Sequence, residues 1–241
     1  MKSKINNFLQ KTTGYILTKG KEDKVSVLFR SKWFQALNIR SVIDVGANSG
    51  QFAKSVRSTM PGADIISFEP IPKEAERLKR DFANDSHFKL FQYALGNENA
   101  TVPFEVNEFS PTSSLLSHTN LQKEYYPITG KTNKIEVEVK RLDEVLKSNE
   151  LKPNILLKID VQGFEDKVIM GAEKLLPSVA IIYVECSFKR FYENQPLFND
   201  IYQLLLKYNF EFRGIGDSLH SGQMDEPVQV DAIFINSSLK I

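Results

Sequence analysis

Short apolar runs alternate along this chain with longer segments whose apolar residues recur at helical spacing, and this alternation constrains the fold more than any other feature. The apolar runs predict buried strands at residues 41–46, 63–70, 88–95, 154–160, 179–185, 209–215 and 229–236. The amphipathic segments predict helices at residues 51–60, 72–84, 164–176 and 196–208. Strands that alternate with helices predict right-handed crossovers and a mostly parallel sheet covered on both faces. The expected fold class is therefore α/β, with a doubly wound, Rossmann-like sheet.

Residues 98–141 interrupt this alternation with two β-like pieces, 100–106 (ATVPFEV) and 134–140 (KIEVEVK). Between them lies a polar, aromatic and turn-rich stretch that is too long for a simple connection in a compact domain. We interpret this stretch as a functional loop or lid, and a surface insertion without function is the alternative. The expected organisation is one α/β domain over residues 31–241 that carries this insertion, preceded by an N-terminal extension or cap over residues 1–30.

The composition of the chain indicates which kinds of binding partner and which cellular compartment to expect. With 31 basic and 30 acidic side chains the net charge is +1, so the basic excess typical of a nucleic-acid-binding protein is missing. No apolar run reaches the ~18 residues of a membrane span, and the N-terminal stretch lacks the pattern of a secretory signal. The single cysteine, Cys186, excludes an internal disulfide and a multi-cysteine metal site. A cytoplasmic location is expected, whereas the sequence does not indicate an oligomeric state.

The stretch DVGANSG at residues 44–50 follows the first predicted strand and leads directly into a helix. In an open parallel sheet, ligands bind beyond the carboxyl ends of the strands, at a topological switch point. Gly46 and Gly50 would let the backbone turn sharply and approach a ligand closely. The second predicted strand ends at Glu69, 19 residues beyond Gly50, where a carboxylate is well placed to accept hydrogen bonds from both hydroxyls of a ribose. The pattern predicts a ligand that contains a nucleoside.

The loop departs from the dinucleotide fingerprint G-x-G-x-x-G, because Asn48 and Gln51 stand at its second and third glycine positions. The carboxylate of Asp44, two residues ahead of Gly46, would repel a pyrophosphate and attract a cation. S-adenosylmethionine, which carries a ribose, a sulfonium and an amino group, fits this arrangement better than a dinucleotide does. Two alternatives stay open at this point: an NAD-dependent oxidoreductase, and a strand–helix turn whose glycines serve geometry alone.

A series of short stretches resembles the FkbM family of class I, S-adenosylmethionine-dependent methyltransferases: VIDVGANSGQFA, FEPIP, YALGN, SSLL and LLKIDVQGFE, in this order. The resemblance runs from about Ser31 to Ile235, and KIDVQGFE is its most family-like part. It implies a seven-stranded fold, S-adenosylmethionine as cofactor, and methylation of hydroxyl groups, often on sugars or natural products.

The same resemblance implies roles for residues of the loops and strand ends. Against the amino-acid part of the cofactor it places the loop residues Gly46, Ala47, Asn48 and Gly50, with Asp44 beside them. At the ribose it places Glu69. Along the adenine it places Pro70, Ile71, Ala94 and Leu95, the last two being equally consistent with plain strand core. Over the cofactor or the acceptor it places Ser113 and Ser114.

The stretch LLKIDVQGFE would form the chemical centre, with Asp160 at the tip of the fourth strand and Glu165 in the first turn of the next helix. Asp160 is expected to lie near both cofactor and acceptor. A hydroxyl acceptor must lose a proton, and Asp160 is the first candidate for the general base, with Glu165 as the second carboxylate. His118 in the long loop, or His220, is an alternative base. Favourable placement at a helix N-terminus is the alternative interpretation of Glu165.

An alternative mechanism uses a divalent metal ion. Some O-methyltransferases use Mg²⁺ to acidify the acceptor, and oxygen ligands would suit that ion. Asp160 and Glu185, at the ends of the fourth and fifth strands, are the candidate ligands. No dense carboxylate motif of known ligand spacing appears in the sequence.

The leading hypothesis is an S-adenosylmethionine-dependent O-methyltransferase that acts on a hydroxyl of a sugar, glycan precursor or secondary metabolite. Its partner would be a small-molecule or glycan acceptor and not a nucleic acid. The alternatives are an N-methyltransferase of another small molecule and a non-catalytic methyltransferase-fold protein that serves in an assembly. Intact Asp44, Gly46, Glu69 and Asp160 argue against the non-catalytic alternative.

Overall fold

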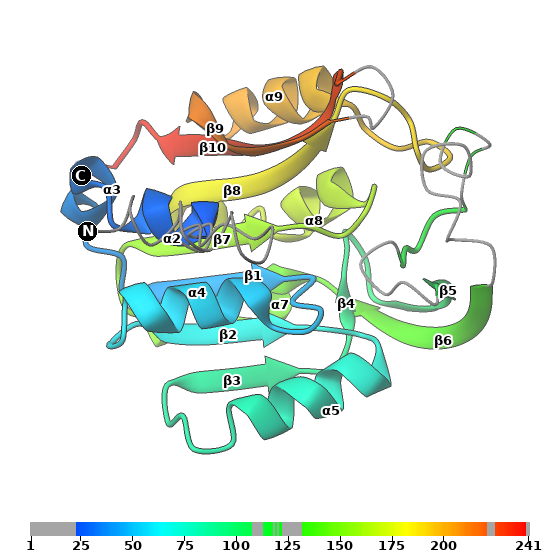
Figure 1. Ribbon diagram of the computed structural model, residues 1–241, viewed down its shortest axis with the longest axis horizontal. Helices are drawn as coiled ribbons and strands as arrows, with labels where there is room; N and C mark the ends of the chain where they lie inside the picture. Colours follow the sequence, from blue (N-terminus) through cyan, green and yellow to red (C-terminus); the bar gives the residue numbers. More distant parts are fainter. Residues whose placement is uncertain are drawn as a thin grey trace, which may run out of the picture.

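The computed structural model describes residues 23–107, 113–117, 119, 121, 132–220 and 225–239. Its centre is a seven-stranded sheet with the strand order β3-β2-β1-β7-β8-β10-β9 (Figure 1). In that order the strands are Phe88–Phe91, Asp64–Phe68, Ser41–Val45, Ile155–Ile159, Val179–Ser187, Pro227–Asn236 and Phe210–His220. β10 runs antiparallel to its neighbours β8 and β9, and the other pairs are parallel. The α/β class and the seven-stranded, mostly parallel sheet are confirmed.

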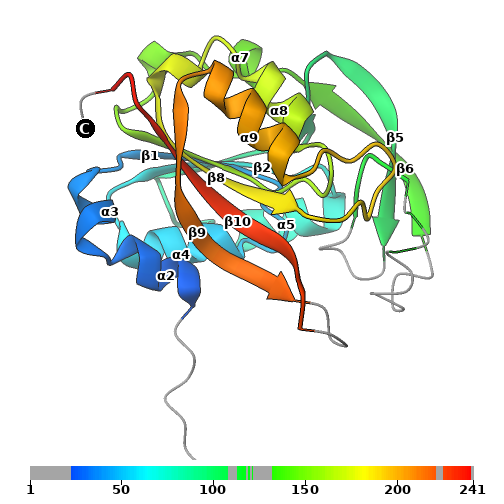
Figure 2. The same ribbon diagram turned by 90° about the horizontal axis from the view of Figure 1, so that it is seen from above.

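Helices cover both faces of the sheet. As a result, every residue of the central strands β1 and β7 is buried. On one face pack α2 (Lys24–Phe29), α3 (Lys32–Ala36), α4 (Gln51–Thr59) and α5 (Pro72–Asp81). On the other face pack α7 (Leu142–Val145), α8 (Glu165–Gly171) and α9 (Phe198–Lys207) (Figure 2). Two short 3₁₀ helices complete the described elements, η3 (Ser148–Glu150) and η4 (Leu176–Ser178).

The helices begin close to their expected positions, and two of them end earlier than expected. α5 begins at Pro72, whose fixed φ suits a first helical position, and it ends at Asp81 rather than at Asn84. α8 ends at Gly171, and the separate 3₁₀ helix that follows contains Pro177. Glycine is a poor helix former and proline cannot continue the helical hydrogen bonds, so the apolar pattern alone overstates the length of this helix.

The insertion supplies two strands, β5 and β6, of a second, smaller sheet with the order β4-β6-β5. Its strands are β4 (Ala94–Leu95), β5 (Ala100–Asn107) and β6 (Thr132–Lys140). The expectation of one continuous strand over residues 88–95 is therefore wrong, since Ala94 pairs with Val139 of β6 and not with the main sheet. An apolar run does not reveal by itself which strand it will pair with. The small sheet lies beyond the carboxyl ends of the main strands (Figure 1).

The first described helices join the main core. Phe29 of α2 and Phe34 of α3 are buried with the residues of α4, and their ring centroids lie 4.7 Å apart. We propose that the α/β domain includes both helices, so that its boundary lies before residue 23. Residues 1–22 of the predicted extension and most of the predicted lid lie outside the described residues. Within the described part of the chain, no helix combines the length and the apolar character needed to cross a membrane.

Candidate active site

A cavity of about 310 Å³ lies at the carboxyl ends of β1, β2 and β7. The strand order reverses at this point, since β2 lies on one side of β1 and β7 on the other. The volume is within the range of small-molecule sites. Of the predicted site residues, its wall includes Gly46, Ala47, Asn48, Glu69, Pro70, Ile71, Ala94, Leu95, Ser113, Asp160 and Glu185. The predicted residues that are described but do not line it are Asp44, Gly50, Ser114, Glu165 and His220.

The loop after β1 turns through left-handed backbone at Gly46, with φ of 76°, and at Gly50, with φ of 81°. A Cβ atom on Gly46 would lie 1.9 Å from the main-chain oxygen of Asp160, and one on Gly50 would lie 2.7 Å from a methyl carbon of Leu78. The sharp turn is as expected, but in both places the close neighbour is the protein itself. These glycines let the loop pack against the end of β7 and against α5.

A Gly46→Ala substitution is expected to destabilise the protein by roughly 3 kcal/mol or more, because the added methyl group overlaps main chain and the backbone is left-handed. Chemical denaturation measures this loss. Gly62→Ala is the matched control, since nothing lies within 4 Å of a Cβ atom there. Equal stability of the two variants would contradict this account of the loop.

Glu69 follows β2 and joins the two loops that border the cavity. Its Oε2 accepts a hydrogen bond of 2.7 Å from the main-chain N–H of Asn48, and its Oε1 accepts one of 2.8 Å from that of Ile71. The side chain is only 3% exposed, and burial raises its pKa to about 7 despite these two donors. Each carboxylate oxygen has two lone pairs, so both oxygens can accept a further hydrogen bond from a ligand in the cavity.

The cavity wall on either side of Glu69 is apolar. Pro70 and Ile71 follow it directly, and Ala94 and Leu95 of β4 also line the cavity, with Ile71 and Ala94 in one apolar cluster. Phe104 of β5 also lines the cavity, so the insertion contributes to it. An apolar wall beside a hydrogen-bonding carboxylate fits a nucleoside, whose base is flat and whose sugar carries hydroxyl groups.

Asp44 lies beneath the loop, where it pairs with Lys158 of the neighbouring strand. The Nζ of Lys158 is 3.2 Å from Oδ1 of Asp44 and donates to the main-chain oxygen of Gly46 at 2.8 Å. Burial raises the pKa of Asp44, and Lys158 opposes this rise. Burial alone would lower the pKa of Lys158, but Asp44 and Asp160 outweigh it and raise that pKa. Asp44 therefore acts on the loop through Lys158 and not by lining the cavity.

Asp160 and Glu185 come together at the ends of β7 and β8. One amide nitrogen, Nε2 of Gln162, donates to Oδ1 of Asp160 at 2.8 Å and to Oε2 of Glu185 at 2.7 Å. All three residues line the cavity. Burial raises the pKa of Glu185 well above its ordinary range, and the neighbouring Asp160 raises it further. The pair therefore offers a carboxylate that has a strong tendency to take up a proton.

The hydrogen bonds from Gln162 to Asp160 and Glu185 are also relevant to the predicted metal site. The N–H donors of Gln162 point at both carboxylates, whereas a metal ion needs their lone pairs. Among the described residues, no three His, Cys, Asp or Glu side chains gather as a group that could hold a metal ion. Asp160 and Glu185 thus form a carboxylate pair that shares the amide donor of Gln162, and the metal hypothesis stays a prediction.

Glu165 faces its own loop and not the cavity. Its Oε1 accepts hydrogen bonds from the main-chain N–H of Gly163 at 2.9 Å and of Val161 at 3.3 Å. It is 2% exposed, and burial raises its pKa to about 7. The predicted partnership of Asp160 with Glu165 therefore differs from the structure, in which Glu185 is the carboxylate next to Asp160. A first-turn carboxylate that accepts main-chain N–H groups stabilises the start of α8.

The raised pKa of Glu165 predicts a pH-dependent stability. The contribution of Glu165 to the free energy of unfolding is highest below its ordinary pKa of 4.5 and is lost as the pH rises through about 7, because the folded protein holds this proton more tightly. Glu165→Gln keeps an oxygen acceptor and removes the charge. We expect the loss of stability between pH 5 and pH 8 to shrink by roughly 2–4 kcal/mol, measured by denaturation across that range.

The control for this measurement is Asp166→Asn, one residue further on, whose side chain pairs with Lys167 near the surface. It should leave the slope of stability against pH unchanged. An unchanged slope in Glu165→Gln as well would contradict the assignment.

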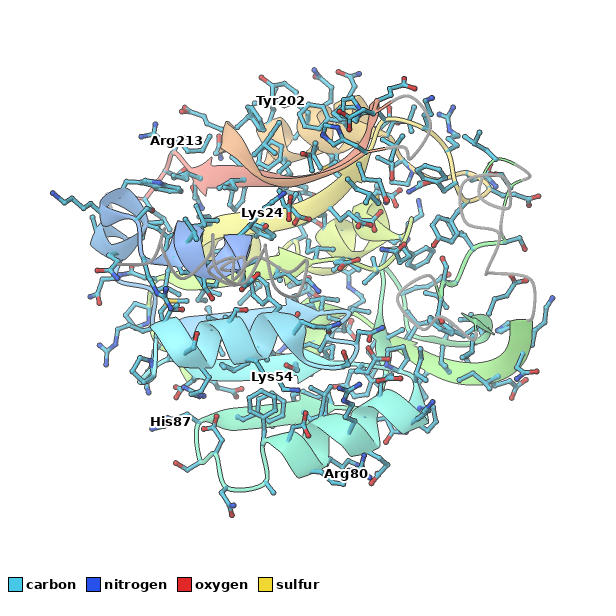
Figure 3. The ribbon with its side chains drawn as sticks, in the orientation of Figure 1. Lys24, Lys54, Arg80, His87, Tyr202 and Arg213 are labelled. Atoms are coloured by element: carbon cyan, nitrogen blue, oxygen red, sulfur yellow. The ribbon has the colours of Figure 1, made fainter. Side chains whose placement is uncertain are left out.

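The remaining predicted residues are spread over the molecule. Ser113 lines the cavity, whereas the Oγ of Ser114 donates to the main-chain oxygen of Gln162 at 2.6 Å. His118, an alternative base, lies outside the described residues. His220 is exposed on β9 and contacts Asp225 at the main-chain oxygen, 2.9 Å away. The remaining histidine, His87, is not a predicted site residue; it directly precedes β3 and lies far from the carboxyl ends of the strands (Figure 3).

Sequence reasoning missed several residues of the site. Gln162 was overlooked although it stands two positions after Asp160, at a turn where its φ is 55°. The signal available in the sequence was a polar residue followed by Gly163, in the same family-like stretch as the predicted base. Tyr93, Phe104 and Leu115 also line the cavity, and no local pattern could find them, because their position depends on how the insertion folds back.

Comparison with known proteins agrees with this geometry. The family model described as Methyltransferase FkbM domain matches residues 44–212. The 2-O-methyltransferase NoeI of Sinorhizobium fredii is 29% identical over 171 residues, which cover 68% of this chain and 70% of that protein. The methyltransferase sdnD of Sordaria araneosa is 30% identical, over 61% of this chain and 67% of that protein. The hexuronic acid methyltransferase AglP of Haloferax volcanii is 30% identical, over 59% of this chain and 54% of that protein.

The matched region contains the loop after β1, Glu69 and the carboxylate pair, and it spans most of the main sheet. The fold, the position of the cavity and the family match agree with one another. This chain therefore belongs to the FkbM family of methyltransferases, and it is an S-adenosylmethionine-dependent enzyme with the class I fold.

Proposed function

We propose that this enzyme methylates a hydroxyl oxygen of a sugar, a glycan precursor or a secondary metabolite. The observation that carries the proposal is that one cavity has Glu69 on its wall and also the carboxylate pair of Asp160 and Glu185. The names of two relatives support it, since NoeI is a 2-O-methyltransferase and AglP a hexuronic acid methyltransferase. The near-balanced charge of the chain supports a small acceptor or glycan over a nucleic acid.

The residues of the cavity fit the cofactor. Glu69 would hold the ribose, and Pro70, Ile71, Ala94 and Leu95 would line the adenine. The loop residues Gly46, Ala47 and Asn48 would contact the amino-acid part, on a loop that Lys158 holds from below. When bound, S-adenosylmethionine supplies a methyl carbon that is activated by the positive charge of its sulfur.

The contribution of the chain itself is alignment and proton removal. Holding two reactants in line contributes on the order of 7–11 kcal/mol to lowering a barrier. The acceptor hydroxyl must give up its proton as its oxygen acquires the methyl group, and we assign that proton to the carboxylate pair. We assign the proton first to Glu185, because Asp160 already lies 3.6 Å from the ammonium group of Lys158 and is paired with it. General-base assistance of this kind contributes typically 10²–10⁴-fold.

The test is an acceptor screen. Purified protein is incubated with S-adenosylmethionine and a panel of free sugars, nucleotide sugars and hydroxylated metabolites, together with amine analogues of each. Formation of S-adenosylhomocysteine is measured, and the product is examined by NMR for an O-methyl signal. We expect O-methylated products only. Transfer to the amine analogues alone, or no transfer by protein that binds the cofactor, would refute hydroxyl methylation.

A further inference from the structure

The side chain of Gln162 connects the two carboxylates of the cavity, and the proposed function does not account for it. Its Nε2 lies 2.8 Å from Oδ1 of Asp160 and 2.7 Å from Oε2 of Glu185. A primary amide nitrogen carries two hydrogens, so one can point at each carboxylate. Hydrogen bonds to a charged acceptor are roughly twice as strong as neutral ones. The amide thus offsets the repulsion between two acidic groups that share one site.

Tyr192 fixes which way this amide faces. Its hydroxyl donates to Oε1 of Gln162 at 2.9 Å, and the tyrosine is 1% exposed. A phenol that donates to the amide oxygen leaves the amide nitrogen to face the carboxylates. The main chain is held as well, because the Oγ of Ser114 donates to the main-chain oxygen of Gln162 at 2.6 Å. Gln162 is therefore held by two segments distant in sequence, one of them from the insertion.

Besides Gln162, one other side chain among the described residues donates a hydrogen bond to Glu185. Nε2 of Gln229 on β10 donates to the same Oε2 of Glu185 at 3.0 Å. Four charged groups act on Glu185. They are Lys158 of β7, Asp160 directly after β7, Glu165 of α8 and Asp231 of β10. Three of these are acidic and raise the cost of a charge on Glu185, whereas Lys158 lowers it. Burial and these acidic neighbours disfavour the charged form of Glu185, and the donors of Gln162 and Gln229 favour it.

We propose that Gln162 is a positioning residue that holds Asp160 and Glu185 side by side as one proton-accepting unit, and that Tyr192 acts through Gln162 by setting its orientation. The role in proton removal rests on the proposed function, whereas the coupling of the side chains does not. The insertion contacts Gln162 through Ser114, and the segment before α9 contacts it through Tyr192. The carboxylate pair is thus assembled only when both segments are in place.

The test measures the carboxylates directly and needs no acceptor. Carboxyl ¹³C signals are followed by NMR against pH in the wild type and in Gln162→Met, Tyr192→Phe and the double variant. Glu185→Gln and Asp160→Asn assign the signals of the pair. Loss of the donors of Gln162 should raise the pKa of Glu185 by about 0.5–1 unit. Tyr192→Phe should give a smaller rise, and the double variant should match Gln162→Met because Tyr192 acts only through the amide.

The chain offers matched controls. Gln203→Met and Tyr202→Phe make the same chemical changes on α9, away from the cavity (Figure 3). They should move no carboxyl signal of the pair. Gln162→Asn is a second variant at the test position, since asparagine tolerates left-handed backbone but is one methylene too short to reach both carboxylates. It should shift the titration in the same direction as Gln162→Met.

Activity provides the second arm, with the acceptor found by the screen. We expect Gln162→Met to lower kcat by 10–100-fold and Tyr192→Phe by 3–10-fold, with no further loss in the double variant and with the Kd of the cofactor changed less than about 2-fold. A titration of Glu185 that is the same in wild type and in both variants at position 162 would overturn the inference. So would additive effects of the two single substitutions. If the titration shifts as expected but no hydroxyl is methylated, the proposed function fails and the coupling stands.

Discussion

Replacing Glu69 with alanine is expected to weaken the binding of S-adenosylmethionine by roughly 100-fold or more. The carboxylate is placed to accept hydrogen bonds from two ribose hydroxyls, and charge-assisted bonds contribute about 1.5–3 kcal/mol each. Two such bonds correspond to at least two orders of magnitude in Kd. Glu69→Gln keeps one acceptor oxygen of the same shape, so it should lose less affinity than the alanine variant. Isothermal titration calorimetry measures both.

The folded state of these variants has to be checked, because Glu69 also accepts hydrogen bonds from the main-chain N–H groups of Asn48 and Ile71. Burial raises the pKa of Glu69 to about 7, so at pH 8 the removal of a buried charge partly offsets the lost hydrogen bonds. Glu76→Ala, an exposed carboxylate on the neighbouring α5, is the control and should bind the cofactor normally. Wild-type affinity in a folded Glu69→Ala protein would show that the ribose lies elsewhere.

Replacing Glu185 with glutamine is expected to lower kcat by 10²–10⁴-fold, the range for loss of a general base. Glutamine preserves the size of the side chain and cannot take up the acceptor proton. Because β1 and β7 separate the strand of Glu185 from the strand that leads to Glu69, cofactor affinity should change less than about 3-fold. Initial rates of S-adenosylhomocysteine formation, measured with an acceptor from the screen, give kcat and KM separately.

Asp160→Asn distinguishes between the two carboxylates. Asp160 contacts Lys158, and Lys158 in turn donates to the main-chain oxygen of Gly46 in the cofactor loop. This substitution should therefore affect cofactor affinity as well as kcat. Glu211→Gln, an exposed carboxylate on β9, is the control for both variants. Full kcat in Glu185→Gln together with an inactive Asp160→Asn would return the role of base to Asp160.

Much of the fold is predictable from the sequence because the central strands are buried on both faces. Continuous apolar runs such as residues 41–46 and 154–160 leave little choice of structure, and the observed strands fall within them. The run over 88–95 looks the same locally, yet it divides between two sheets. Whether Ala94 pairs with the main sheet or with Val139 depends on a segment more than forty residues further on, and no local pattern carries that information.

In the candidate site, too, some residues can be predicted from the sequence and others cannot. Glu69 is predictable because the end of the second strand has a fixed place relative to the loop after the first strand. Glu165 is misleading because its spacing from Asp160 suggests a pair, whereas the side chain turns back to accept N–H groups of its own loop. The contact from Gln162 to Glu185 joins residues 23 positions apart in the sequence and needs the register of β7 against β8.

The most direct test of the central claim is a crystal structure of the protein with S-adenosylhomocysteine. The account predicts that the ribose hydroxyls lie within hydrogen-bonding distance of the Glu69 carboxylate, with the adenine against Ile71 and the amino-acid part beside Gly46. Electron density for the ligand in another part of the molecule, or a Glu69 carboxylate that makes no contact with the sugar, would contradict it.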